Sequence, residues 1–341
     1  MKALAKICDG KVDLVDLPEP MIRPNAVKVK VDYCALCATD IHIVTQDLYH
    51  FSKDLLPMGL GHEGSGTIVE LSDEAAEMGY KIGDKVAVAS LGHCGVCDEC
   101  KRAHDVFCEH STSAMPMATE YAVVNLDMIF KIPENADPLH YCIAEPCASA
   151  MQGIDIADIQ IGDSVLISGV GGIGAILLDM LTKRGATKLT ASDPLPQKRQ
   201  RALDMGAQYV IDPSSEDIVE KGLEITGGRG YDVIIEASGV PAAAPPLLNL
   251  IAKKGKVVYF AVFPMDYELP VNLYEMYMKE ASLHTVYTSI YNYPRVIDLL
   301  PQMQLDKIIG PIMPLSDAVN AFELYKKSEY PKIVIKCNED A

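Results

Sequence analysis

Hydrophobic and polar residues alternate with a period of two in the first part of the chain. Residues 26–33 read Ala-Val-Lys-Val-Lys-Val-Asp-Tyr, and residues 66–71 alternate in part. Such alternation predicts strands with one buried face. Glycine and proline recur between these runs, for example at Pro18, Pro24 and Gly83. Short strands separated by frequent turns predict a β-barrel domain over about the first 145 residues.

The pattern changes after about residue 160, where short apolar runs alternate with stretches compatible with helices. Strands are predicted at 163–168, 188–193, 208–211, 231–236 and 255–260, and helices at 173–184 and 198–205. Strands that alternate with helices in this way predict a parallel sheet covered by helices. Further helices are predicted at 294–304 and 316–327, the second behind a cap at Ser316.

Composition limits the possible partners. The 341 residues suffice for two domains, and a hydrophobic fraction of 49% with 23% charged residues is typical of a soluble globular protein. No apolar run approaches the roughly 20 residues that span a bilayer, and no secretion signal is visible, so we expect a cytoplasmic protein. A net charge of −17 argues against nucleic acid and against anionic membranes. A small-molecule partner is expected instead.

Four of the ten cysteines lie close together, at Cys94, Cys97, Cys100 and Cys108. Thiolates at this spacing can surround one tetrahedral zinc ion and leave no position for a substrate, which predicts a structural zinc site. An iron–sulfur cluster is the alternative, because ligation by sulfur alone also suits it. A disulfide framework is typical of much smaller secreted chains.

A second candidate metal site combines Cys37 with the adjacent pair His62 and Glu63. Sulfur, nitrogen and oxygen donors from two separate loops are typical of a catalytic zinc that keeps one position open. Each residue alone is a weak signal, but together, shortly before a four-cysteine cluster, they predict a catalytic metal.

A glycine-rich stretch follows the first predicted strand of the α/β region. Its members are Gly169, Gly171, Gly172, Ile173 and Gly174. Between a strand and a helix, such glycines allow the backbone to approach a pyrophosphate at the helix N-terminus.

Asp193 ends the next predicted strand, where a carboxylate can bind both ribose hydroxyls. Its charge would repel a 2′-phosphate, so the sequence predicts NAD rather than NADP as the cofactor.

Taken together, these motifs resemble the zinc-containing medium-chain alcohol and polyol dehydrogenases over essentially the whole chain. The element Ala144-Glu145-Pro146 is similar to the branch that includes sorbitol, threonine and sugar-alcohol-phosphate dehydrogenases. The resemblance implies an α/β plus β fold, in which a GroES-like β-barrel catalytic domain contains an inserted Rossmann domain. The catalytic domain would cover 1–148 and 286–341, with a zinc lobe at about 92–110, and the Rossmann domain 149–285.

The same resemblance assigns roles around the catalytic metal. Glu145 would complete the zinc site of Cys37, His62 and Glu63, although Cys147 lies only two residues away and remains an alternative. Asp40 would orient His62. Two zinc ions per chain are therefore expected.

Further roles concern the substrate and the cofactor. Thr39 matches the hydroxyl that hydrogen-bonds the substrate oxygen, and His42 matches the relay that carries the proton to solvent. Lys198 stands where family members often contact the ribose with a cation. An ordinary solvated lysine is nearly as good an interpretation of Lys198.

The predicted reaction is hydride transfer between a secondary alcohol or polyol, with or without a phosphate, and NAD. Sorbitol dehydrogenases carry an Arg-Tyr pair where this chain has Thr288 and Ser289, so strict sorbitol selectivity is not expected. Alternatives are a threonine-type 3-hydroxy amino acid dehydrogenase, a zinc-free quinone reductase and an NAD-binding redox sensor. The resemblance also implies a homodimer or homotetramer.

Overall fold

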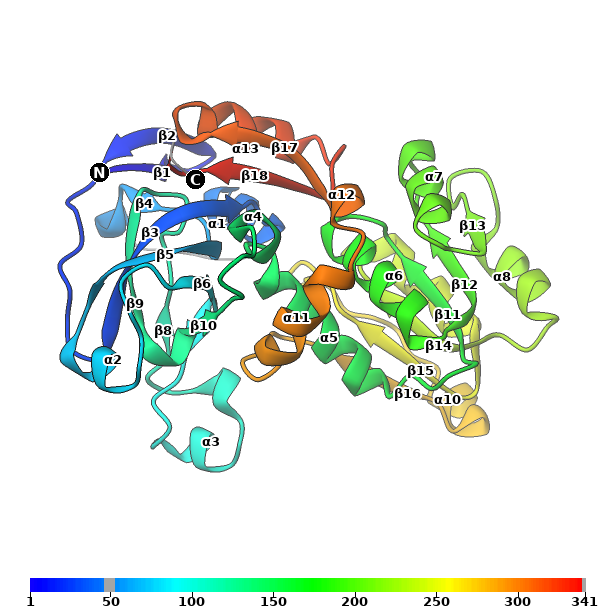
Figure 1. Ribbon diagram of the computed structural model, residues 1–341. Helices are drawn as coiled ribbons and strands as arrows, with labels where there is room; N and C mark the ends of the chain where they lie inside the picture. The colour runs from blue at the N-terminus through cyan, green and yellow to red at the C-terminus, as the bar shows by residue number, and fades with distance from the viewer. Residues whose placement is uncertain (46–52, 339–341) are drawn as a thin grey trace. The chain divides into compact units, whose positions relative to one another are not determined.

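The computed structural model describes residues 1–45 and 53–338 (Figure 1). The chain forms two compact units. The first contains residues 1–148, 288–305 and 309–341, and the second contains residues 149–287 and 306–308. Among the described residues, no helix is both long enough and apolar enough to cross a membrane.

Antiparallel strands dominate the first unit. A seven-stranded sheet has the order β10-β6-β5-β3-β18-β17, with β9 also paired to β3, and smaller sheets have the orders β2-β1-β4 and β7-β8. The strands are β1 (Lys2–Cys8), β2 (Lys11–Asp16), β3 (Ala26–Ala35), β4 (Met58–Gly59), β5 (Glu63–Leu71), β6 (Lys85–Val88), β7 (Leu91–Gly92), β8 (Thr112–Ser113), β9 (Tyr121–Asn125), β10 (Ile129–Lys131), β17 (Ile309–Pro314) and β18 (Lys332–Lys336). The predicted β domain thus contains strands from both ends of the chain.

Strand β3 is buried more completely than its alternating sequence predicts. It pairs with β5, β9 and β18, so both of its edges are covered. Lys28 is nevertheless accommodated, because its ammonium binds the carboxylates of Glu19 and Glu70 at 2.5 and 2.8 Å. A lysine in an alternating run can therefore be buried on a strand when carboxylates from neighbouring segments form ion pairs with its ammonium.

The helices of the first unit are short. They are α1 (Ala38–Thr45), α2 (Asp73–Glu77), α3 (Asp98–Lys101), α4 (Pro138–Tyr141), α11 (Tyr293–Leu299) and α13 (Ala318–Lys326). The predicted cap at Ser316 is wrong: a 3₁₀ turn, Leu315–Asp317, runs directly into α13, whose N-cap is Asp317. Helix α5 (Ala144–Ala157) continues into the second unit, and α12 (Leu305–Ile308) also includes residues of both.

The second unit is a parallel sheet of six strands in the order β13-β12-β11-β14-β15-β16, as the sequence predicts for a Rossmann fold (Figure 1). The strands are β11 (Ser164–Ser168), β12 (Thr187–Ser192), β13 (Tyr209–Ile211), β14 (Tyr231–Glu236), β15 (Ile251–Tyr259) and β16 (Ser282–Thr285). The helices are α6 (Gly172–Arg184), α7 (Pro196–Asp204), α8 (Ile218–Thr226), α9 (Ala244–Asn249) and α10 (Leu273–Lys279). The order changes direction beside β11, so the loop after β11 lies at the switch point where such sheets bind ligands.

Candidate functional site: two metal-binding groups and a nucleotide loop

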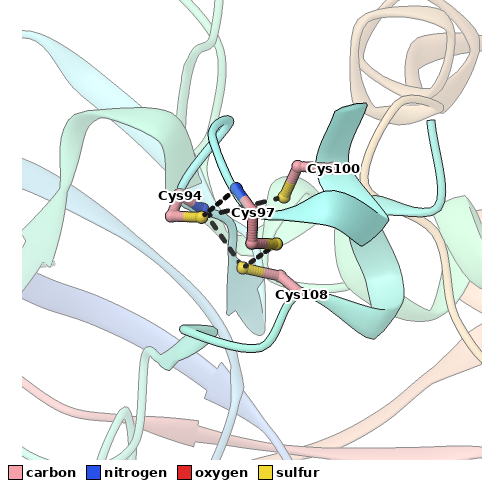
Figure 2. A group of neighbouring side chains, drawn as sticks. All are labelled: Cys94, Cys97, Cys100 and Cys108. Atoms are coloured by element: carbon pink, nitrogen blue, oxygen red, sulfur yellow. Dashed lines mark hydrogen bonds between the residues drawn. The ribbon is translucent and has the colours of Figure 1, made fainter. Parts of the chain in front are cut away.

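The four predicted cysteine ligands meet in one small lobe around α3. Their sulfur atoms all lie within 4.8 Å of one another and face a common centre (Figure 2). The Cys94 and Cys100 sulfurs are 4.0 Å apart, and those of Cys97 and Cys108 are 3.9 Å apart. Four sulfurs bound tetrahedrally to one zinc ion at about 2.3 Å would be about 3.8 Å apart. The donor set therefore fits a zinc ion with no open position.

Backbone N–H groups stabilise negative charge on these sulfurs. The N–H groups of Val96 and Cys97 donate to the Cys94 sulfur, and those of Cys94 and His110 donate to the Cys108 sulfur. The donors from Val96 and Cys97 lower the pKa of Cys94 to about 6, whereas burial raises the pKa of Cys100 to about 12. Metal binding at this lobe must therefore release the proton of Cys100.

The second predicted metal group is also assembled. Ligand atoms of Cys37, His62 and Glu63 lie within 4.8 Å of one another. Strand pairing accounts for this, because β3 and β5 are antiparallel and place Ala35 opposite Glu63. Gly61 turns the chain into the site with φ +86°, and a Cβ there would lie 2.6 Å from the backbone nitrogen of Ala118. Only glycine meets both requirements.

Asp40 contacts Cys37, Gly61 and His62 and so holds this group together. Its buried carboxylate accepts hydrogen bonds from the N–H groups of Cys37 and Gly61, at 2.9 and 3.0 Å. One of its oxygens lies 3.5 Å from Nδ1 of His62, a buried atom without a hydrogen bond to a described residue. Burial opposes ionisation of Asp40, but His62 and these N–H groups hold its pKa below the usual value. With Nδ1 facing a carboxylate, the other ring nitrogen of His62 suits a metal.

Lys332 on β18 also belongs to this site, although its position in the sequence does not indicate it. Its ammonium donates to both carboxylate oxygens of Glu63, at 2.5 and 2.7 Å, and to the Leu36 carbonyl at 3.3 Å. Both side chains are almost fully buried. Although burial opposes its charge, the carboxylate of Glu63 raises the pKa of Lys332 well above the usual value. Burial would likewise raise the pKa of Cys37, but the charges of Lys332 and His62 lower it to about 7.

Other predicted residues lie near this group without joining it. Glu145 and Cys147, both buried on α5, are outside the set of ligand atoms within 4.8 Å, so the choice between them stays open. One oxygen of Glu145 accepts a hydrogen bond from the Ser90 hydroxyl at 2.9 Å. On α1, the Thr39 hydroxyl lies 3.6 Å from the Cys37 sulfur, and His42 follows three residues later.

The glycine-rich loop has the geometry that its sequence predicts. It connects β11 to α6, which begins at Gly172. Gly169 has φ +94°, and a Cβ there would lie 2.8 Å from the backbone of Ser238. A Cβ on Gly174 would lie 2.0 Å from the carbonyl oxygen of Gly169. These two glycines therefore allow the tight turn from strand to helix that a pyrophosphate site needs.

Asp193 lies beside this loop, directly after β12. Its carboxylate accepts hydrogen bonds from the N–H groups of Val170 and Leu195, at 2.9 and 3.0 Å, and is buried. The Lys198 ammonium is 3.9 Å from the same carboxylate. The loop, the carboxylate and the lysine are thus brought together as the sequence predicts.

Comparison with known proteins assigns the fold to a family. Residues 23–134 match the model of the alcohol dehydrogenase GroES-like domain, and residues 172–302 match that of the zinc-binding dehydrogenases. The chain is 32% identical to L-threonine 3-dehydrogenase of Pyrococcus furiosus, over 76% of this chain and 74% of that protein. The chain belongs to the zinc-dependent medium-chain alcohol dehydrogenase family. The predicted fold class, with a GroES-like domain and a Rossmann sheet, is confirmed.

Two further relatives extend this similarity to the whole chain. The (R,R)-butanediol dehydrogenase of Bacillus subtilis is 27% identical, over 99% of this chain and 100% of that protein. A solved structure described as a zinc-binding dehydrogenase from Clostridium scindens is 34% identical, with a TM-score of 0.93 and coverage of 98% of both chains. As a member of this family, the protein is a zinc-dependent oxidoreductase that uses a nicotinamide cofactor, in agreement with the sequence analysis.

Proposed function

We propose that the protein transfers hydride between NAD and a small secondary alcohol that carries a neighbouring hydroxyl group. The Cys37–His62–Glu63 group carries this proposal, because a mixed set of three donors leaves a position for the substrate oxygen. A zinc ion held there supplies Lewis acidity, which lowers the pKa of an alcohol. The catalytic domain, at 1–148 and 286–341, would hold the zinc, and the Rossmann domain, at 149–285, would hold NAD.

In this proposal, Thr39 and His42 move the proton. They are three residues apart on α1 and so share one face of that helix. The Thr39 hydroxyl, next to the Cys37 sulfur, accepts the proton of the substrate alcohol as it releases its own proton toward His42, which passes a proton on to solvent. Asp40 and Lys332 hold His62 and Glu63 in place through the contacts described above.

NAD is proposed over NADP because of Asp193. Its carboxylate lies against the glycine loop, where the ribose of a dinucleotide binds, and negative charge there repels a 2′-phosphate. Lys198 stands next to it and is proposed to contact the ribose. Comparing kcat/KM with NAD and with NADP checks this assignment, and a preference for NADP would contradict it.

A polar substrate is favoured by the acids around the metal group. The polar carboxylates of Glu63 and Glu145 suit a substrate with several hydroxyl groups better than a long apolar alcohol, and the relative from Bacillus subtilis is named for a diol. A phosphorylated polyol is included in this class. A second candidate is a 3-hydroxy amino acid, because several relatives are named L-threonine 3-dehydrogenases.

The deciding experiment measures kcat/KM with NAD for vicinal diols, matched mono-alcohols, polyol phosphates and L-threonine. We expect each diol to exceed its mono-alcohol. A preference for L-threonine would establish the second candidate. A preference for hexanol or benzyl alcohol would overturn the polyol proposal but leave the zinc–NAD chemistry in place. Metal analysis of the same preparation separates the enzyme from a zinc-free reductase or a redox sensor, since two zinc ions per chain are expected.

A homodimer or homotetramer is also proposed. Strand β16 ends the six-stranded sheet, and large apolar side chains are exposed on the neighbouring helix α10, at Leu273, Tyr274 and Tyr277. Open strand edges and clustered exposed apolar groups favour association with another chain. Light scattering of the purified protein tests this, with Tyr277→Glu as the variant expected to lower the molar mass. A monomeric wild type would contradict it.

A further inference from the structure

Glu145 is held in place by Ser90, a residue outside the Cys37–His62–Glu63 group. It lies in the first turn of α5 and is buried, and its Oε1 accepts a hydrogen bond from the Ser90 hydroxyl at 2.9 Å. Burial raises the pKa of Glu63, and the nearby charge of Glu145 adds to that rise. The carboxylate of Glu145 is therefore close to the Cys37–His62–Glu63 group and depends on Ser90 for its position.

Tyr293, at the start of α11, lies next to this pair. It is fully buried and stacks on Phe130, with ring centroids 4.6 Å apart and planes inclined by 7°. Its hydroxyl makes no hydrogen bond of normal geometry to a described residue. Burial and the charge of Glu145 raise the pKa of Tyr293 well above the usual value, while the backbone and hydroxyl of Ser90 oppose the rise. The phenol oxygen thus lies against Ser90 and within the field of Glu145.

Packing alone gives no reason for this hydroxyl. A phenylalanine would stack on Phe130 equally well, and it would avoid burying a polar group without a partner. Groups that position metal-binding side chains, in contrast, are commonly hydrogen-bonding side chains behind them. The location of the hydroxyl, next to the serine that holds Glu145, fits this second role.

We propose that Tyr293 is a positioning residue for the metal group. In the zinc-loaded enzyme its hydroxyl would donate to Ser90, which donates to Glu145, and this chain of hydrogen bonds would keep the Glu145 carboxylate beside the Cys37–His62–Glu63 group. The three residues come from distant segments: the stretch after β6, the start of α5 and the start of α11. The proposal rests on the proposed function, because it assumes that zinc binds to that group.

The test removes only the hydroxyl, with Tyr293→Phe in the zinc-loaded enzyme. We expect kcat to fall about tenfold and the zinc dissociation constant of the Cys37 site to rise by a similar factor, as for other residues that support metal ligands. The visible spectrum of the cobalt-substituted enzyme should change. The KM for NAD should stay the same, and the melting temperature should not be lowered. A merely structural tyrosine would leave the cobalt spectrum and the zinc affinity unchanged, which would overturn the proposal.

A double-mutant comparison tests whether Tyr293 acts through Glu145. In the Glu145→Gln background, adding Tyr293→Phe should change zinc affinity by less than about twofold, because the carboxylate it serves is already lost. Equal effects in both backgrounds would overturn the proposal. Tyr231→Phe is the matched control, since it removes a buried tyrosine hydroxyl, bonded to Thr190, in the other unit and should leave the cobalt spectrum unchanged. A wild type without zinc at Cys37 would instead overturn the proposed function.

Discussion

The two metal-binding groups of the first unit are built in opposite ways. The cysteine lobe draws its four sulfurs from one short stretch, and apart from contacts between the sulfurs themselves, the described hydrogen-bond donors to them are backbone N–H groups. The Cys37–His62–Glu63 group joins two separate segments of the chain and is flanked by the charged side chains of Asp40 and Lys332. Lys332 is 269 residues away from Glu63 along the chain.

This difference matches the proposed roles, in which one site stabilises the fold and the other performs chemistry. Backbone donors fix the charge of the cysteine lobe whatever side chains surround it, and four sulfurs leave no room for a substrate. In the other group, removable side chains set the charge and orientation of each donor, so its properties can be changed one residue at a time. Variants of the two groups should therefore fail differently.

The largest effect is expected from His62→Ala. Losing a ligand of the second group removes several kcal/mol of Lewis-acid stabilisation, and activity should fall by about 1000-fold or more. Zinc content should drop from two ions per chain to one, while the circular dichroism spectrum is retained. His104→Ala, at an exposed position in the cysteine lobe, is the control and should keep both activity and zinc. If His62→Ala retained activity, the second group would not be the catalytic site.

Lys332→Met should be the most destabilising change. It leaves Glu63 buried beside an apolar side chain, and breaking a buried pair in this way costs about 3–5 kcal/mol. Urea unfolding measures this loss. Adding Glu63→Gln should recover part of it, because the unpaired charge is removed. Lys326→Met, at a partly exposed position on α13, should have little effect on stability. Equal stabilities of the two lysine variants would show that the pair is unimportant.

A smaller loss of stability is expected from Cys97→Ser. Zinc binding in such a lobe contributes directly to folding, so weaker binding should lower the melting temperature by roughly 5 °C or more. Some dehydrogenase activity should survive in the folded fraction, in contrast to His62→Ala. Cys8→Ser changes an exposed free thiol and serves as the control. Complete loss of activity in a stably folded Cys97→Ser protein would contradict the division of roles.

The smallest effect is the pH dependence of zinc binding at the two sites. At the second group the pKa of Cys37 is lowered to about 7. Burial opposes the charge of His62, but Asp40 and Cys37 raise its pKa well above the usual value, so zinc must displace the His62 proton and its affinity should fall on acidification. The Cys100 pKa is raised to about 12, so zinc binding to the lobe should release a proton throughout the range from pH 6 to 9. Its affinity should fall about tenfold for each unit of acidification. Competition with a chromophoric chelator measures both curves, and an affinity that does not change with pH at either site would contradict this account.

Features built from one short stretch of sequence could be predicted, whereas features built from distant segments could not. The cysteine lobe and the Gly169–Gly174 loop are local patterns whose spacing determines their geometry, and both are assembled in the structure as expected. The alternation of strands and helices likewise predicts the parallel sheet, because each element carries its own periodicity. Local patterns were therefore sufficient for the fold class and for the two most regular sites.

Residues that act through long-range contacts could not be found in this way. Lys332 opens a short apolar strand, Lys-Ile-Val-Ile-Lys, and nothing in those five residues indicates that Glu63 lies opposite. A lysine at the start of an apolar run is a weak signal, since most such lysines are solvated. Tyr293 and Ser90 carried no signal either. The incorrect cap at Ser316 has a related cause, since a preceding 3₁₀ turn takes the place of a side-chain cap.

The pairing of Glu63 with Lys332 also orders events during synthesis. Ribosomes make the chain from its N-terminus, so Cys37, His62 and Glu63 emerge long before the lysine that neutralises the site. The residues between them include the whole second unit, which is nearly continuous in sequence and does not need β18 in order to fold. The first unit cannot bury Glu63 with its partner until β18 has been made and has paired with β3. The proposed catalytic group is thus completed late, although Cys37, His62 and Glu63 are among the first residues to be translated.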